Sequence, residues 1–203
     1  TVRSNVIRGF DWTNNGAATW TGIHLQMGQV AIGGDPTQGN TIGSATGTGS
    51  IVITNGASTT QEIDGIFGIR AFSNLAGPAI SIANNTIASI RTGSAPNINH
   101  FFNAIYTGRS STTITDLGAF NITENKIGNG TPHSIGIGVQ GSASPLVRNI
   151  AYGIHNTAEG TIAFLGNTIQ NISAFGVGMD PSWAQSEVYG IQFTGAGGGG
   201  KRA

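Results

Sequence analysis

The chain has 203 residues, of which 33 are Gly and only 9% are charged, and its formal net charge is zero. A zero net charge gives no electrostatic reason to expect nucleic acid as a partner. The lack of Cys excludes a disulfide framework and a thiolate metal site, and no run of 18 apolar residues predicts a membrane span.

Two short phrases alternate along the sequence. The chain begins with an Asn-x-Ile phrase, SNVIRGF (4–10), and continues with TGIHL (21–25), in which a small residue precedes Ile. The later copies are GNTIGSA (39–45), DGIFGI (64–69), NNTIASI (84–90), NAIYT (103–107), ENKIGNG (124–130), YGIHN (152–156), GNTIQNIS (166–173) and YGIQF (189–193). A period of about 20–50 residues is typical of repeat architectures.

Residues 65–90 show how one repeat folds. GIFGIRAF predicts a short strand, SNLAGP a turn, AISIA a strand with one buried face, and TIASI a third short strand after Asn84 and Asn85. The following RTGSAPNINHF predicts a loop. Three short strands of this kind make one coil of a parallel β-helix, and coils stack about 4.8 Å apart.

Stacking predicts two interior columns of Ile, because a single coil cannot bury its own apolar residues. One column is Ile7, Ile42, Ile87, Ile127 and Ile169, and the other is Ile23, Ile66, Ile105, Ile154 and Ile191.

The repeated Asn residues are expected at the bends between strands, where Asn tolerates left-handed backbone angles. Their side-chain amides would hydrogen-bond along the stack, as in other stacked β structures. They are Asn5, Asn40, Asn85, Asn125 and Asn167.

The coil length stays open at this point, at about 40 residues or about 20, and the three strands of 65–90 favour the longer coil. The sequence predicts an all-β fold, a single right-handed parallel β-helix of about five coils with long loops, over residues 1–194. GAGGGGKRA (195–203) predicts a flexible tail or a truncation. The flanking phrases carry no charged cap, so we expect either adjacent coils of a longer solenoid or end-to-end stacking on neighbours.

NTIASI, NTIQNIS, YGIHN and YGIQF resemble the repeats of right-handed parallel β-helix proteins, the group that includes pectate lyase-like folds. They are most similar to Gly/Ser/Thr-rich repeats of large secreted or surface proteins of bacteria. The resemblance covers nearly the whole chain and implies an extracellular or cell-surface location. Members include polysaccharide lyases, glycoside hydrolases, adhesins and phage tailspikes, so the fold alone does not choose a function.

The acidic residues give little support to catalysis. Glu62 and Asp64 are the only closely spaced pair, whereas a glycosidase needs two carboxylates about 5–10 Å apart. Asp64 and Asp116 are the candidate catalytic acids of an enzymatic alternative. The positions that we align with Asp64 on other coils carry no second acid; they are Thr21, Asn103, Tyr152 and Tyr189. The four His residues lack metal-ligand spacing, so no metal or cofactor is expected.

The residue after Ile in the second phrase points outward, because side chains alternate along a strand. It reads His24, Phe67, Tyr106, His155 and Gln192. Four rings in a chain that is 7% aromatic predict either a stacked ladder covered by a loop or a platform for sugar rings.

These patterns predict a non-catalytic structural or adhesive module of a larger secreted or cell-surface protein, with a polysaccharide or cell-surface glycan as the candidate partner. The first alternative is a polysaccharide-degrading enzyme that acts on the outer face of the coil. The second is an ice-binding solenoid that uses Thr41, Thr86 and Thr168, although Val6 and Lys126 interrupt that column.

Overall fold

A computed structural model describes residues 1–14, 19–55, 62–73, 79–94, 98–109, 118–139, 148–176 and 186–194. These residues form strands, turns and bends without a helix, so no helix among them could cross a membrane. The strands assemble into four parallel sheets of four or five strands each. The predicted fold, an all-β parallel β-helix of about five coils, is confirmed.

The first two sheets meet at a corner of every coil. Sheet 1 contains β1 (Val6–Ile7), β5 (Thr41–Gly43), β9 (Thr86–Ala88), β13 (Lys126–Ile127) and β17 (Thr168–Ile169). Sheet 2 contains β2 (Phe10–Asn14), β6 (Ile51–Asn55), β10 (Ile90–Ser94), β14 (Ile135–Ile137) and β18 (Ile172–Ala174).

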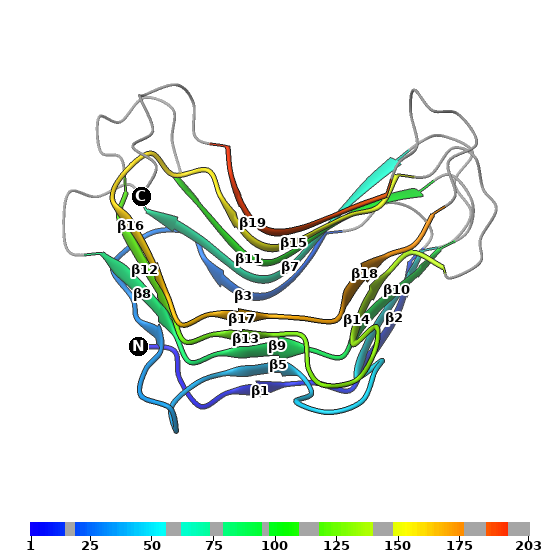
Figure 1. Ribbon diagram of the computed structural model, residues 1–203, viewed down its shortest axis with the longest axis horizontal. Coiled ribbons are helices and arrows are strands. Elements are labelled where there is room, and N and C mark those ends of the chain that lie inside the picture. The colour runs from blue at the N-terminus through cyan, green and yellow to red at the C-terminus, as the bar shows by residue number, and fades with distance from the viewer. Residues whose placement is uncertain are drawn as a thin grey trace.

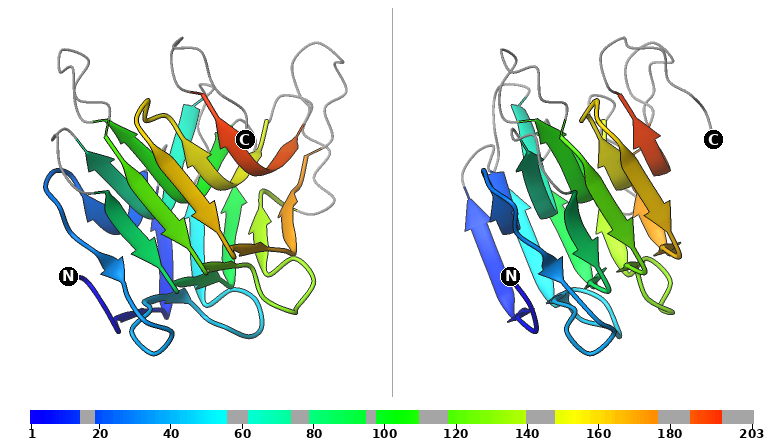
Figure 2. Two further views of the ribbon diagram at one scale, coloured as in Figure 1. Left: turned by 60° about the vertical axis from the view of Figure 1, so that its left-hand side comes forward. Right: turned by 90° about the vertical axis from the view of Figure 1, so that its left-hand side faces the viewer.

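The other two sheets complete the coil. Sheet 3 contains β3 (Thr19–Leu25), β7 (Glu62–Ser73), β11 (Ile98–Arg109), β15 (Ile150–Asn156) and β19 (Glu187–Phe193). Sheet 4 contains β4 (Ile32–Gly33), β8 (Ile80–Ala83), β12 (Phe120–Thr123) and β16 (Ile162–Leu165). The strands of each sheet lie one behind another in Figure 1, and the side views of Figure 2 show the coils stacked in chain order.

Each of the first four coils therefore has four strands, and the described part of the fifth has three. The coil length is the longer of the two open alternatives, with 35 to 45 residues between successive repeated Asn residues. The three-strand coil expected from residues 65–90 is wrong. TIASI divides at Ser89, whose φ of 60° turns the chain from β9 into β10. The loop predicted after it begins instead as the rest of β10, because that strand pairs with β6 along its whole length.

The first predicted Ile column is confirmed, since Ile7, Ile42, Ile87, Ile127 and Ile169 are in register in sheet 1. The second is correct in four coils. In β7, Ile69 lies beside Ile23 and Ile105, whereas Ile66 lies beside Trp20 and Phe102. DGIFGI contains two Gly-Ile pairs, and the structure places the second of them in this column.

The five repeated Asn residues form a hydrogen-bonded ladder along the corner between sheets 4 and 1. Each of the first four donates its backbone N–H and its Nδ2 to the Oδ1 of the Asn on the next coil, as Asn85 does to Asn125 at 3.0 Å in both bonds. Asn85 donates its remaining Nδ2 proton to the carbonyl of Ile32, the first residue of β4. Asn40, Asn85 and Asn125 are 0% exposed, so the amides satisfy one another and the backbone away from water.

The left-handed backbone angles expected for these Asn residues lie instead, in four of the five coils, on the residue before them. Ser4, Asn84, Glu124 and Gly166 have φ between 53° and 66°. The division has a physical reason: the preceding residue makes the bend, and the repeated Asn then stays in an ordinary conformation that points its amide along the stack.

Sheet 3 is bent, and its outer face is concave in the view of Figure 1, where its middle approaches sheet 1. The approach depends on small residues. A Cβ on Gly68 would lie 2.9 Å from Ile87 of sheet 1 and 2.6 Å from the carbonyl oxygen of Ala104. This explains the small residue before Ile in the repeated phrase, because a larger side chain would push sheets 1 and 3 apart.

Candidate functional site

The outward side chains of sheet 3 form two columns, which together we call the concave face. The first column differs from the prediction in one coil, because β7 contributes Arg70 where Phe67 was expected. It reads His24, Arg70, Tyr106, His155 and Gln192.

Phe67 lies in the second column, three residues before Arg70 in β7. That column reads Thr21, Phe67, Asn103, Tyr152 and Tyr189. Thr21, Asn103, Tyr152 and Tyr189 were aligned with Asp64 in the sequence, and this alignment is wrong, since their register partner in β7 is Phe67. The concave face therefore carries all three Tyr residues of the chain.

Aromatic rings surround the guanidinium group of Arg70 where β7 and β11 form the concave face. The guanidinium carbon of Arg70 lies 4.7 Å from the ring centroid of Phe67 and 4.9 Å from that of Phe72. Tyr106 packs edge-to-face on both rings, at 5.6 and 5.8 Å. Cation–π contacts of this type each contribute about 0.5–2 kcal/mol, so the cluster holds Arg70 in one orientation. Its Nε is buried and has no hydrogen-bond partner among the described residues.

Where β15 and β19 form the concave face, three rings are stacked in a row. Tyr152 lies between His155, at 4.4 Å with 27° between the planes, and Tyr189, at 5.2 Å with 13°. The ring nitrogens of His155 are hydrogen-bonded to Asn103 and Thr194, both at 2.9 Å. Burial lowers the pKa of His155 below its ordinary value, so the imidazole on this face is neutral at physiological pH.

One carboxylate lies at the edge of this row. Glu187 accepts a hydrogen bond from the Tyr189 hydroxyl and forms an ion pair with Arg148 at 2.7 Å. The bond from Tyr189 and then that from Arg148 lower the pKa of Glu187, which keeps its carboxylate ionised. Burial, with a further contribution from Glu187, raises the pKa of Tyr152, so that hydroxyl stays protonated.

The two candidate catalytic acids do not come together in the described structure. Asp64 is in β7, and its backbone is in register with that of His100 rather than with an acid. Asp116 lies outside the described residues, as does the predicted tail at 195–203. Among the residues that are described, no group of three or more His, Asp or Glu side chains could hold a metal ion.

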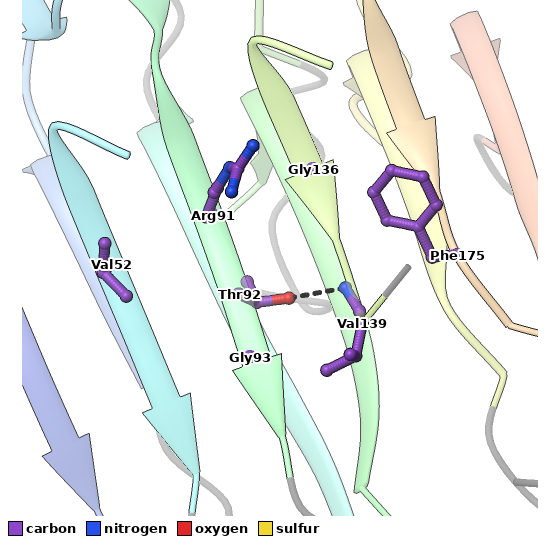
Figure 3. Close-up of a pocket in the computed structure, with 8 residues that line it drawn as sticks. Val52, Arg91, Thr92, Gly93, Gly136, Val139 and Phe175 are labelled. Carbon is purple, nitrogen blue, oxygen red and sulfur yellow. Dashed lines mark hydrogen bonds between the residues drawn. The ribbon is translucent and has the colours of Figure 1, made fainter. Parts of the chain in front are cut away.

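A second surface feature, which the sequence did not indicate, is a groove of about 330 Å³ on the outer face of sheet 2. Figure 3 shows Arg91 and Phe175 on opposite sides of Gly136, which is the register partner of Arg91. A Cβ on Gly136 would lie 3.3 Å from the Phe175 ring, so the groove exists because this position has no side chain. Phe175 in turn packs edge-to-face on His133 at 5.3 Å.

Sequence reasoning missed Arg70, Tyr152 and Tyr189 as members of the concave face, and it missed Phe72, which lies beside that face and contacts Arg70. A signal was available for the three residues of the concave face. Alignment of the repeated phrase on Gly68-Ile69 would have placed Arg70 outward, and it would have put the Tyr of both YGI phrases, Tyr152 and Tyr189, in the column of Phe67. The position of Phe72 and the sheet 2 groove depend on side-chain packing that the repeated sequence phrases do not indicate.

Comparisons with protein-family models, curated proteins and solved structures find no match for this chain. What the structure itself supports is the coarser part of the resemblance, a parallel β-solenoid with strands in register.

Proposed function

We propose that this chain is a non-catalytic structural and adhesive module of a larger secreted or cell-surface protein, and that it contacts carbohydrate through the concave face. The observation that carries the proposal is the convergence on this face of all three Tyr residues, His155 and Arg70, in a chain that is only 7% aromatic. As part of this proposal, the chain is related to pectate lyase-like folds and most closely to the repeats of bacterial surface proteins.

The chemistry of the face suits a sugar chain. Aromatic rings offer a flat apolar surface, and Tyr adds a polar edge to it. The concave face also carries two buried polar atoms without hydrogen-bond partners among the described residues, Arg70 Nε and Gln192 Oε1. Buried polar atoms without partners are unusual in a folded protein, and a sugar hydroxyl would pair with these two only after the neighbouring side chains moved aside.

A polysaccharide-degrading enzyme is the first alternative, and Glu187 argues against it on this face. A general acid needs a raised pKa so that it still holds a proton near neutral pH. The pKa of Glu187 is lowered, and both its carboxylate oxygens are already engaged by Tyr189 and Arg148.

An ice-binding solenoid is the second alternative, and sheet 1 would have to carry it. The outward column of that sheet contains Thr41, Thr86 and Thr168 in register, together with Val6 and Lys126. A regular Thr array is therefore interrupted in two of five coils, which makes this surface a weaker candidate than the concave face.

The test is a panel of polysaccharides in which binding and cleavage are scored on the same samples. We expect binding without cleavage, and we expect Tyr152→Ala combined with Tyr189→Ala to abolish it. This pair is preferred to Phe67→Ala with Tyr106→Ala, because those two rings also hold Arg70 and their loss would disturb the fold.

Phe175→Ala in the sheet 2 groove serves as the matched control, since it removes one ring from a different outer face. Retained binding in this control assigns the contact to the concave face. Cleavage that is lost on Asp64→Asn or Asp116→Asn would instead establish the enzymatic alternative, and the absence of any binding would refute the carbohydrate part of the proposal.

A further inference from the structure

The groove on the outer face of sheet 2 joins a cation to an aromatic wall, and the proposed function uses neither. Arg91 projects from β10 on one side of Gly136, and the ring of Phe175 lies on the other side (Figure 3). Arg91 is exposed, and among the described residues its guanidinium has no ion pair, hydrogen bond or cation–π contact. An unpaired guanidinium beside an aromatic ring suits a ligand that carries both a negative charge and an apolar ring.

The charge of Arg91 is not cancelled along its own column. The outward column of sheet 2 reads Asp11, Val52, Arg91, Gly136 and Ser173. Asp11 is two coils away from Arg91, which at about 4.8 Å per coil is roughly 10 Å. That separation is close to the Debye length at physiological salt, so solvent ions screen most of the attraction between the two charges. The column therefore keeps a positive charge at the groove.

The floor of the groove favours a flat ligand. A Cβ on Gly136 would lie 3.3 Å from the ring of Phe175 and 3.9 Å from Cγ of Arg91. A carbon atom at this place would touch both walls, because carbon atoms attract one another best at about 3.5–4.0 Å. One layer of carbon atoms therefore fits between the walls at the floor. A planar aromatic ring has this thickness, whereas a puckered sugar ring is thicker.

The aromatic wall is held in place by its own neighbours. Phe175 packs edge-to-face on His133, with the ring centroids 5.3 Å apart. Nδ1 of His133 is in turn hydrogen-bonded to Oγ of Ser173 at 2.7 Å. The ring of Phe175 is thus positioned before a ligand arrives, which lowers the entropic cost of binding.

The rim of the groove is fixed as well. Gly138 donates its backbone N–H to Oγ1 of Thr92 at 2.8 Å, which ties the chain after β14 to β10 (Figure 3). Val139 follows directly and is 42% exposed, so its apolar side chain is available to a ligand. The groove volume of about 330 Å³ is at the lower end of the range of small-molecule sites, which suits a single ring.

We propose that this groove binds a small aromatic carboxylate. The ring lies between Phe175 and the aliphatic stem of Arg91, the carboxylate accepts hydrogen bonds from the Arg91 guanidinium, and Val139 covers the outer edge of the ring. Binding is reversible, and no covalent bond forms or breaks. The site is on a different sheet from the concave face, so neither surface requires the other.

The test is a protein-observed NMR titration of the whole chain with benzoate. We expect saturable shifts of the backbone amide signals of Arg91, Gly136 and Val139, with a dissociation constant on the order of millimolar, as is usual for so small a ligand. Cyclohexanecarboxylate keeps the charge without the flat ring, and benzamide keeps the ring without the charge. Each should bind at least about fivefold more weakly than benzoate.

Arg91→Gln is the decisive variant, because it removes the charge of an exposed side chain on which no described contact depends. It should raise the dissociation constant for benzoate at least about tenfold, since a charge-assisted hydrogen bond becomes a neutral one. Arg8→Gln is the matched control. Arg8 is also exposed, lies on the first coil outside the groove, and has no ion pair or hydrogen bond among the described residues. This control should bind benzoate like the original chain.

The absence of saturable shifts at the three amides would overturn the proposal. Equal binding of benzoate and cyclohexanecarboxylate would also overturn it, as would an equal loss in Arg91→Gln and Arg8→Gln. None of these results depends on polysaccharide or on the concave face, so failure here is distinct from failure of the proposed function.

Discussion

Sheets 1 and 3 pass through the same five coils, but equivalent positions are filled differently in the two sheets. At the corner before sheet 1 every coil carries Asn, and the interior column of that sheet is Ile in every coil. The first outward column of sheet 3 changes at almost every coil, from His to Arg, Tyr, His and Gln. The same residue type recurs where stacked coils hydrogen-bond or pack on one another in the interior. The residue type varies where a side chain of sheet 3 faces outward.

The stacked interior and the outer face differ for a physical reason. A buried amide in the ladder depends on identical amides above and below it, because an unpaired polar group in the interior costs about 1–3 kcal/mol. An outward ring on the concave face depends only on fitting its neighbours, and edge-to-face, stacked and cation–π contacts all occur there. The outer face is therefore free to differ from coil to coil without loss of the fold.

The largest expected effect comes from breaking the ladder in its middle. Asn85→Leu removes the acceptor of Asn40 and the donors to Asn125 and Ile32, all in a fully buried place. We expect the free energy of unfolding in urea to fall by at least about 3 kcal/mol, since several buried polar groups lose their partners.

Asn5→Leu is the matched control for that variant, because the same substitution falls on the exposed first member of the ladder. It should cost about 1 kcal/mol, the usual net value of a hydrogen-bonded group near the surface. Equal losses in the two variants would contradict the view that the ladder acts through mutual burial.

A smaller effect is expected from acid on the concave face. The folded state lowers the pKa of His155 through burial, so below the ordinary value of 6.5 the unfolded chain takes up a proton that the folded chain resists. Stability supplied by this group is complete above that pH and is lost as the pH falls toward the lower pKa of the folded state. Glu187 acts in the same direction, but in the more acidic window below its ordinary value of 4.5.

His155→Gln checks this prediction by urea unfolding between neutral pH and pH 5. Gln is already present at the same position of the next coil, Gln192, so the substitution suits the site. We expect the variant to lose less stability than the original chain over this range. The same pH dependence in both proteins would show that His155 does not carry the effect.

Much of the fold could be predicted from the sequence, because the residues that determine stacking recur in every coil. Ile at a fixed place and Asn before it predict stacked coils and one interior column without knowledge of the loops. The second column went wrong at DGIFGI, where two Gly-Ile pairs compete and only the packing of Gly68 against Ile87 selects the second.

The concave face could be predicted in part. Tyr106 and His155 were placed outward, but Arg70 was missed together with its contacts to Phe67 and Phe72. The bend of sheet 3 was not predicted either. It arises from the close approach of sheets 1 and 3, which neither the Asn-x-Ile phrase nor the Gly-Ile phrase indicates alone. Local repetition reports on stacking between coils, whereas the shape of the outer face depends on contacts across the coil.

The most direct test of the carbohydrate proposal is oxidative footprinting of the chain with and without the polysaccharide that it binds best, read by mass spectrometry. The carbohydrate proposal predicts that bound polysaccharide protects Tyr152 and Tyr189, which are half-buried on the concave face, while Phe175 in the sheet 2 groove and Phe10 on the first coil react as before. Binding that leaves the reactivity of these Tyr residues unchanged, or that protects Phe175 instead, would contradict it.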